Sequence, residues 1–229
     1  MSGWSYLARP SAHRTFRDRR HAGRVLAELL APYAGTDRLL VLGLARGGVP
    51  VGWEVAAFLH APLDVFLVRK LGVPQWEELA MGALATGGRV VINDRLLHNL
   101  GIDDADLQAT IDRESVELAR REGLYRGDRG PLDLAGRTVI LVDDGIATGA
   151  SMLVAVRTVR AADPRRIVVA VPVGPESACR QLAEEADDVV CATMPADFES
   201  VGQVFADFHQ VPDEEVSALL AAPTAPDAD

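Results

Sequence analysis

The amino-acid sequence predicts an α/β domain whose mainly parallel sheet is covered by helices on both faces. Apolar segments of strand length alternate with helical segments along most of the 229 residues, and 48% of the residues are hydrophobic. Several of the predicted strands are apolar at every position, which is typical of parallel sheets that are buried on both sides. In such sheets ligands bind at the carboxyl ends of the strands, so the loops that follow the strands are the first candidates for a functional site.

The first half of the chain predicts two strands, two helices and one long connection. An amphipathic helix is expected at residues 19–33, followed by a continuously apolar strand at 38–44. The glycine turn after this strand leads into a second helix, with Pro50 in its first turn. Residues 62–70 predict another strand. Residues 71–88 contain four glycines and predict a loop, and a loop of this length inside a compact domain is usually functional or disordered.

The second half continues the same alternation. A strand is expected at 89–94 and a long polar helix at 103–123, whose first turn is acidic. The last residues, 221–229, predict a disordered tail. The remaining expected elements are strands at 137–144, 165–173 and 187–193, with helices at 149–162 and 176–186 between them.

Composition excludes several classes of protein. The net charge of −10, without an extended basic face, argues against nucleic-acid binding. No apolar run approaches the roughly 20 residues of a membrane helix, and the N-terminus lacks the apolar centre of a signal peptide. Cys179 and Cys191 are too few for a disulfide framework or a structural zinc site, so a cytoplasmic location is expected. The five histidines show no ligand spacing.

The segment VILVDDGIATGAS, residues 139–151, carries the strongest chemical signal. An apolar strand ends at Asp143 and Asp144, and small residues then turn into a helix. Free backbone N–H groups at a helix start, together with the hydroxyls of Thr148 and Ser151, make a cradle for an anion. Carboxylates beside such a cradle suit a ligand with a phosphate and neighbouring hydroxyls or a divalent metal. The alternative from the pattern alone is a helix capped by an aspartate after a core strand.

All 13 positions of this segment resemble the 5-phosphoribosyl-1-pyrophosphate (PRPP) binding motif of type I phosphoribosyltransferases. The resemblance implies that Asp143 and Asp144 hold the ribose hydroxyls. It also implies the fold of that family: a doubly wound, mainly parallel sheet with a small hood. A single domain at 1–220 is expected, with hood segments at 95–130 and 193–220. The residues implied to bind the 5′-phosphate are Ala147, Thr148, Gly149, Ala150 and Ser151.

Family members carry a pyrophosphate loop after the first core strand, and GLARGG, residues 43–48, stands in that place. By itself this stretch is equally consistent with a plain glycine turn. The resemblance implies a non-proline cis peptide between Ala45 and Arg46, and a mobile loop at 71–88 that closes over the reacting centre. Lys70 is the single lysine of the chain and ends the predicted strand. The residues implied to contact pyrophosphate are Ala45, Arg46, Gly47, Gly48, Arg69 and Lys70.

The resemblance implies that a nitrogen nucleophile, most simply a nucleobase, displaces pyrophosphate from C1 of PRPP, as in purine or pyrimidine salvage. The expected catalytic residues are Asp143, Asp144, Lys70 and Arg46. Mg²⁺ is expected as cofactor, held mainly through PRPP with the two aspartates as candidate ligands. The expected partners are PRPP and a base or amine, and a homodimer is a further expectation.

The acceptor stays open at this stage. Residues 194–208 resemble the purine-binding end of hypoxanthine-type members, with Phe198 and Val201 as candidate contacts, although their spacing is one residue longer. Ala147 stands where 6-oxopurine enzymes carry an acid, and the region before the last strand lacks their lysine. Trp76 in the predicted loop is another candidate contact. Glu77 or Glu78 in the same loop could act as acid or base.

The nearest resemblance is to poorly characterised bacterial type I members, which share the pattern F-x-D-R-x-x-A-G, here Phe16–Gly23, and the segment VRKLG. This similarity runs from about Phe16 to Leu220. Some members of the family are non-catalytic regulators that sense PRPP or a nucleotide, and this is the alternative function. Hydrolysis or phosphorolysis of a ribosyl phosphate in the same pocket is a third. The basic residues Arg46 and Lys70 favour turnover.

Overall fold

The computed structural model describes residues 14–222 and 224, with the exception of 75 and 128. Most of the predicted tail at 221–229 lies outside these residues. Ala221 is the last residue of a helix, and the Thr224 hydroxyl donates a hydrogen bond of 2.8 Å to the carbonyl of Ala61. Among the described residues no helix combines the length and the apolar character needed to cross a membrane.

The centre of the molecule is a five-stranded sheet in the order β2-β1-β6-β7-β8, and every neighbouring pair of strands is parallel. This confirms the predicted fold class. These strands consist of residues that are buried at almost every position, because helices cover both faces of the sheet. Their bounds are β1 Leu39–Leu44, β2 Leu63–Phe66, β6 Thr138–Val142, β7 Arg166–Val173 and β8 Asp188–Thr193.

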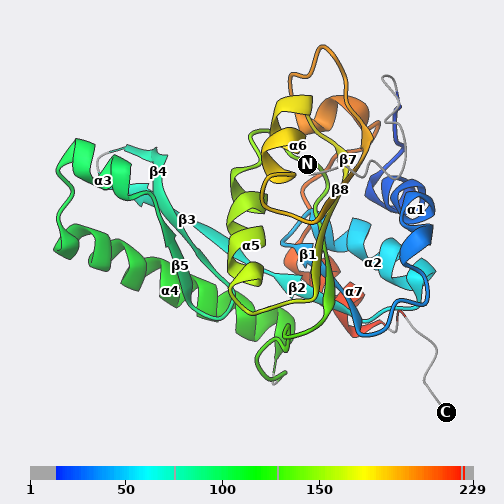
Figure 1. Ribbon diagram of the computed structural model, residues 1–229, viewed down its shortest axis with the longest axis horizontal. Coiled ribbons are helices and arrows are strands. Elements are labelled where there is room, and N and C mark those ends of the chain that lie inside the picture. Colours follow the sequence, from blue (N-terminus) through cyan, green and yellow to red (C-terminus); the bar gives the residue numbers. More distant parts are fainter. Residues whose placement is uncertain (1–13, 75, 128, 223, 225–229) are drawn as a thin grey trace.

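Helices α1, α2 and α7 cover one face of this sheet, and α5 and α6 cover the other (Figure 1). Alternate strand residues enter two separate cores: Val41 and Ile140 pack beneath α1 and α2, whereas Leu42 and Leu141 pack beneath α5 and α6. The bounds are α1 Arg19–Leu29, α2 Gly48–Leu59, α5 Ala150–Arg160, α6 Glu176–Leu182 and α7 Asp213–Ala221, with short 3₁₀ helices η1 Ala31–Tyr33 and η2 Val201–Val204.

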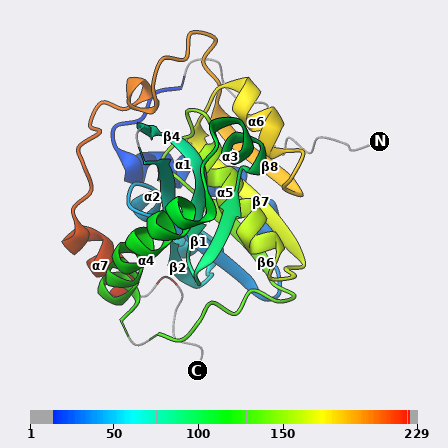
Figure 2. The same cartoon turned by 90° about the vertical axis from the view of Figure 1, so that its left-hand side faces the viewer.

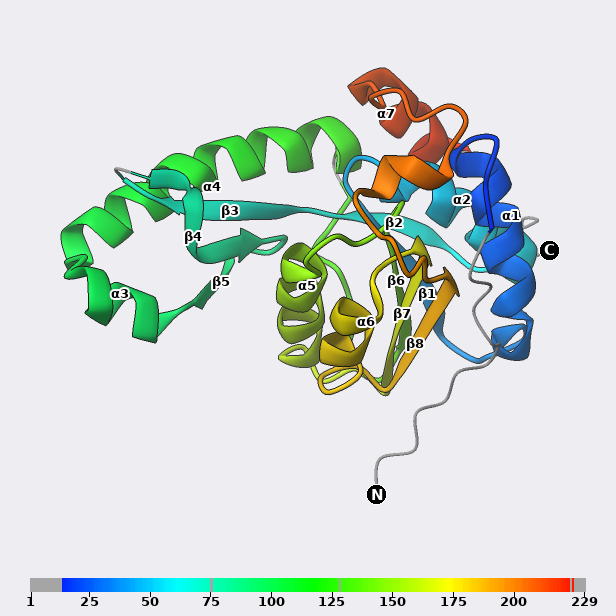
Figure 3. The same ribbon diagram turned by 90° about the horizontal axis from the view of Figure 1, so that it is seen from above.

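A second, antiparallel sheet extends away from the core together with two helices, and we call residues 68–126 the arm (Figures 1 and 3). Helix α4 runs along the arm and packs on one face of its sheet. Figure 2 looks at the molecule from the side on which the arm projects. The arm consists of β3 Val68–Val73, β4 Trp76–Ala85, β5 Arg89–Ile92, α3 Asp94–Leu100 and α4 Asp104–Arg126.

The arm corrects two expectations from the sequence. The strand predicted at 62–70 is two strands, because the backbone of Leu67 turns away from the core sheet and bonds to Thr86. The Leu67 N–H donates to the Thr86 hydroxyl at 2.8 Å, and the Thr86 N–H donates to the Leu67 carbonyl at 2.9 Å. Residues 71–88 are not a structureless loop: most of them belong to β3 and β4. Gly82 serves strand packing, since a Cβ there would lie 2.6 Å from the Val91 carbonyl oxygen.

Candidate active site

Strands β1 and β6 are neighbours in the sheet, but the helices that follow them pack on opposite faces. This is the topological switch point of a doubly wound sheet, where the two loops after the strands separate and leave a crevice for a ligand. The parallel register pairs Gly43 with Val142, so both strands end at the same height. The two loops with the strongest sequence signals, 45–48 and 143–151, therefore lie side by side.

Two glycines allow these loops to touch. A Cβ on Gly47 would overlap the carboxylate of Asp144, and a Cβ on Gly48 would overlap the carbonyl oxygen of Val142. The peptide bond between Ala45 and Arg46 is cis, as predicted. The glycine pair therefore does more than make a turn: it brings the backbone of the first loop against the paired carboxylates of the second.

The two carboxylates are partly buried and interact with each other. The Asp143 carboxylate accepts a hydrogen bond of 2.8 Å from the backbone N–H of Asp144. Burial raises the pKa of Asp143 well above its usual range, and the neighbouring charge of Asp144 raises it further. Burial also raises the pKa of Asp144, although Arg19 opposes this shift. The surroundings thus oppose the ionised form of the pair, and a bound cation or hydroxyl donors would stabilise that form.

Arg19, the first residue of α1, holds Asp144 in place. Its Nε lies 2.7 Å from Asp144 Oδ2, and its Nη1 donates to the carbonyl of His209 at 2.6 Å. The guanidinium also lies 4.0 Å from the centre of the Phe208 ring. This residue was not among the predicted site residues. The signal for it was present, because Arg19 is the arginine of the Phe16–Gly23 pattern, but the pattern says nothing about its partner.

Residues 147–151 form an open turn at the start of α5. Gly149 has φ = 77° and leaves the start of the helix without a capping side chain. The Thr148 hydroxyl accepts a hydrogen bond of 3.3 Å from the N–H of Ala150. Ala147, Thr148 and Ser151 are exposed. Small exposed residues and N–H groups at a helix start have the character of an anion cradle.

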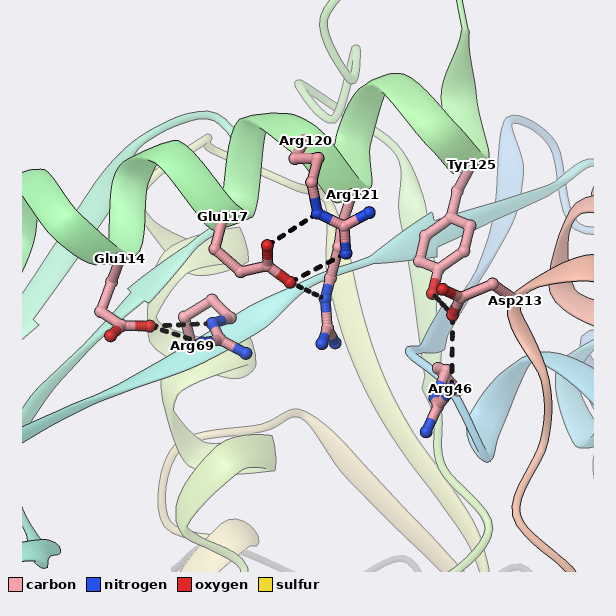
Figure 4. A network of polar contacts seen from close by, with 8 residues as sticks. All are labelled: Arg46, Arg69, Glu114, Glu117, Arg120, Arg121, Tyr125 and Asp213. Carbon is pink, nitrogen blue, oxygen red and sulfur yellow. Dashed lines mark hydrogen bonds and ion pairs between the residues drawn. The ribbon is translucent and has the colours of Figure 1, made fainter.

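The predicted cations separate into two groups. Arg46 pairs with Asp213 of α7 at 3.4 Å, and Arg69 pairs with Glu114 of α4 at 2.6 Å (Figure 4). Lys70 is the next residue of β3 and is exposed on the opposite side of the arm's sheet. Arg69 and Lys70, predicted to act together, therefore face different surroundings. Lys70 also does not end a core strand, because β3 belongs to the arm.

Comparison with known proteins identifies the family to which the chain belongs. A family model described as the phosphoribosyl transferase domain matches residues 17–208. The chain belongs to this family. A curated protein of Mycobacterium tuberculosis strain CDC 1551, provisionally named a phosphoribosyl transferase, is 46% identical over 205 residues, which cover 90% of this chain. The chain spans 46% of that relative, so about half of its length.

A solved structure is also similar over almost the whole chain. The crystal structure of protein TT1426 from Thermus thermophilus has a TM-score of 0.79 and 47% sequence identity, and the similarity covers 90% of this chain and 97% of that one. Together with the sheet order, these relatives confirm the expectation of a type I phosphoribosyltransferase fold with poorly characterised bacterial relatives.

This phosphoribosyltransferase domain has a cavity of about 630 Å³ between the arm and the outer side of α5. The cavity brings Lys70 of the arm and Ser151 of the predicted 5′-phosphate loop onto one surface. Its volume lies in the usual range for small-molecule sites. The remaining lining residues are Val68, Ala80, Gly82, Ala83, Val91, Ile92, Asn93, Asp94, Arg95, Ala150, Leu153, Val154 and Arg157.

The three candidate acceptor contacts lie in different places. Val201 is at the site, since a Cβ on Gly145 would lie 2.5 Å from its Cγ1 and Gly145 follows Asp144. Phe198 packs against the apolar cluster that contains Phe16. Trp76 begins β4, at the end of the arm away from the core, and its residue surface is 58% exposed. The side chains of Glu77 and Glu78 lie outside the described part of the structure.

Proposed function

We propose that this domain is a PRPP-dependent phosphoribosyltransferase, a pentosyltransferase that passes the phosphoribosyl group to a nitrogen acceptor and releases pyrophosphate. The observation that carries the proposal is the contact between Gly47 and the Asp144 carboxylate at the switch point. This contact joins a loop suited to pyrophosphate to a loop suited to a ribose phosphate, at the position where doubly wound sheets bind ligands.

The proposed roles follow from the surroundings of each residue. Asp143 and Asp144 accept hydrogen bonds from the ribose hydroxyls, and residues 147–151 bind the 5′-phosphate through their N–H groups and hydroxyls. Ala45, Gly47 and Gly48 offer backbone, and Arg46 offers charge, to the pyrophosphate. Lys70 acts from the arm, across the cavity that it shares with Ser151. Catalysis then consists of holding C1 in position and stabilising the charge that develops on the leaving group.

The paired aspartates also suit Mg²⁺. They supply the oxygen ligands that this ion prefers. A bound cation would stabilise the charged form of both groups, which burial opposes in the protein alone. Mg²⁺ supplies charge neutralisation for pyrophosphate when bound. The acceptor in this proposal is a nucleobase, with Val201 beside the site, and salvage of purines or pyrimidines is the corresponding role. A cytoplasmic location and a homodimer complete the proposal.

The test of this function is incubation with PRPP, Mg²⁺ and a panel of nucleobases and amines while pyrophosphate release is followed. Release with one acceptor and not with water alone is the expected result. Binding of PRPP without release in the presence of any acceptor would favour the non-catalytic, sensing function. Failure to bind PRPP would contradict the proposal as a whole.

The double substitution Asp143→Asn with Asp144→Asn tests the ribose assignment. We expect PRPP binding to fall below detection in calorimetry, because the two charges that hold the hydroxyls and the cation are removed. A matched control exists in Asp103→Asn with Asp104→Asn, two adjacent and exposed aspartates at the start of α4, where Asn still caps the helix. Circular dichroism should show both variants folded. Wild-type affinity in the first variant would contradict the assignment.

A further inference from the structure

Three arginines from different parts of the chain lie along α4. Arg46 comes from the turn between β1 and α2, Arg69 from β3 and Arg121 from α4 (Figure 4). Their side chains are similarly half-buried, at 27%, 29% and 29% exposure. Arg121 was not among the predicted site residues. In the close-up it points down from α4 into the space between Arg69 and Arg46.

Each of the three arginines has a carboxylate partner. Arg46 pairs with Asp213 at 3.4 Å, whereas the other two make short contacts. The distances are 2.6 Å from Arg69 to Glu114 and 2.7 Å from Arg121 to Glu117. These pairs neutralise each guanidinium group within the protein. Arg46 and Arg121 also lie near each other, because both act electrostatically on Tyr125 and Asp213. Internal pairing does not explain why arginines from three elements lie along α4 in a chain of net charge −10.

Each carboxylate also has a second partner of its own. Asp213 accepts a hydrogen bond of 2.5 Å from the Tyr125 hydroxyl, and Glu117 also pairs with Arg120 at 2.7 Å. Glu114 lies 3.3 Å from Arg113 as well. Each arginine can therefore leave its carboxylate and bind a new anion, while the carboxylate keeps its second partner. This matters because a partly buried carboxylate that loses its only partner destabilises the protein strongly.

The Tyr125 partner is suited to this exchange. Burial raises the pKa of Tyr125 to about 12, and the hydrogen bond to Asp213 raises it as well, so the phenol remains a neutral donor at physiological pH. The Arg46 contact with Asp213 at 3.4 Å is longer than the 2.7–2.9 Å that is usual for a charge-assisted hydrogen bond. Asp213 thus binds Tyr125 more closely than it binds Arg46.

Arg46 also lies at the edge of the proposed PRPP site. Arg46 directly precedes Gly47, the residue that touches the Asp144 carboxylate. Planar guanidinium groups bind phosphate oxygens through paired hydrogen bonds, and several of them are needed to balance a diphosphate. Arg46 belongs to the core, Arg69 to the first strand of the arm, and Arg121 to helix α4.

We propose that Arg121 is a binding residue for the diphosphate group of PRPP, and that it acts together with Arg46 and Arg69. The inference rests on the proposed function and adds a contact from the arm to the site. On binding, Arg121 and Arg46 exchange Glu117 and Asp213 for phosphate oxygens, while Arg120 and Tyr125 keep those carboxylates paired. The arm thereby takes part directly in holding the leaving group.

The test compares Arg121→Gln with Arg160→Gln. Arg160 is the last residue of α5, away from residues 147–151; it pairs with Asp187 at 2.9 Å and its side chain is 41% exposed, so it serves as the matched control. Calorimetry would measure binding of PRPP with Mg²⁺, inorganic pyrophosphate, and ribose 5-phosphate. For Arg121→Gln we expect about tenfold or greater loss of affinity for PRPP and pyrophosphate, the effect of one lost charge-assisted contact, and no change for ribose 5-phosphate. Arg160→Gln should stay within twofold of wild type.

The outcomes separate this inference from the proposed function. If the wild type binds PRPP and Arg121→Gln binds it equally well, the role of Arg121 is wrong. An equal loss of ribose 5-phosphate binding would also overturn the role, because that ligand has no diphosphate. Arg121→Lys should recover part of the affinity, since it restores the charge without the planar fork. If the wild type itself binds no PRPP, the proposed function fails instead.

Discussion

Asp143 illustrates how a single residue can favour function over stability. Its carboxylate is partly buried beside a second carboxylate, and both effects raise its pKa. A raised pKa in the folded state means that the charged form is destabilised by folding. Folding therefore opposes the ionised form of Asp143, which is the form that a bound cation or hydroxyl donors would stabilise.

Substituting Asp143→Asn should accordingly stabilise the protein. We expect the free energy of unfolding at pH 7.5 to rise by roughly 1 kcal/mol or more, because each unit by which folding raises a pKa costs about 1.4 kcal/mol when the group is ionised. The gain should shrink as the pH falls and vanish below about 3, where the wild-type carboxyl is protonated in both the folded and the unfolded state. Urea unfolding at several pH values measures this difference. A control is Asp104→Asn, which is exposed and should change little; a destabilised Asp143→Asn would contradict the prediction.

Lys70 offers a second prediction for a single residue. The proposed site uses a compact ammonium on the arm, opposite Ser151, and the guanidinium of Arg is wider and planar. We expect Lys70→Arg to lower the rate of pyrophosphate release more than twofold at saturating PRPP. The reciprocal change Arg89→Lys, at the exposed start of β5, should have no effect. A rate within twofold of wild type would mean that the single lysine has no special role.

At the scale of elements, the turn between β1 and α2 is the most constrained part of the site. Its glycines are required by contact, because a side chain on Gly47 would occupy the space of the Asp144 carboxylate. The predicted helix and strand on either side of this turn were confirmed, since apolar strands followed by glycine and proline give clear signals.

Gly47→Ala should therefore damage the site. We expect at least tenfold weaker PRPP binding and a loss of roughly 1–3 kcal/mol in stability, as is usual for overpacking. Gly123→Ala is the matched control: Gly123 lies in α4 with nothing within 4 Å of the added Cβ. Because Ala favours a helix over Gly, the control should be stabilised by roughly 0.5–1 kcal/mol. Thermal unfolding and calorimetry measure both effects, and unchanged PRPP binding by Gly47→Ala would contradict the expected contact.

The elements of the arm were predicted less well, for a physical reason. The four glycines of residues 71–88 suggest a loop, but Gly82 is needed because β4 and β5 lie close together, and Gly72 lies at an irregularity of the β3–β4 pairing. Irregular pairing weakens the alternation by which a strand is recognised in sequence. Helix α3 was not expected either, being only seven residues long.

For the molecule as a whole, the parallel, doubly wound class of the sheet and the loops at the carboxyl ends of its strands could be predicted, and the partners of the charges could not. Apolar strands at the centre of the chain determine the parallel core, and its switch point locates the ligand loops. The pairs of Arg46 with Asp213 and of Arg19 with Asp144 join residues 167 and 125 positions apart. No local pattern relates such residues, because their contact depends on how the arm, α1 and α7 pack around the core.

The pairing of the two ends of the domain has a consequence for how the protein is made. The Phe16 N–H donates to the Val204 carbonyl at 2.7 Å, the Ala206 N–H donates to the Phe16 carbonyl at 2.8 Å, and Arg19 reaches the carbonyl of His209. The side chain that holds Asp144 is thus synthesised among the first residues of the domain and receives its last partner among the final ones. A nascent chain on the ribosome can form the central strands early, but it can complete the site only after residue 209 has emerged.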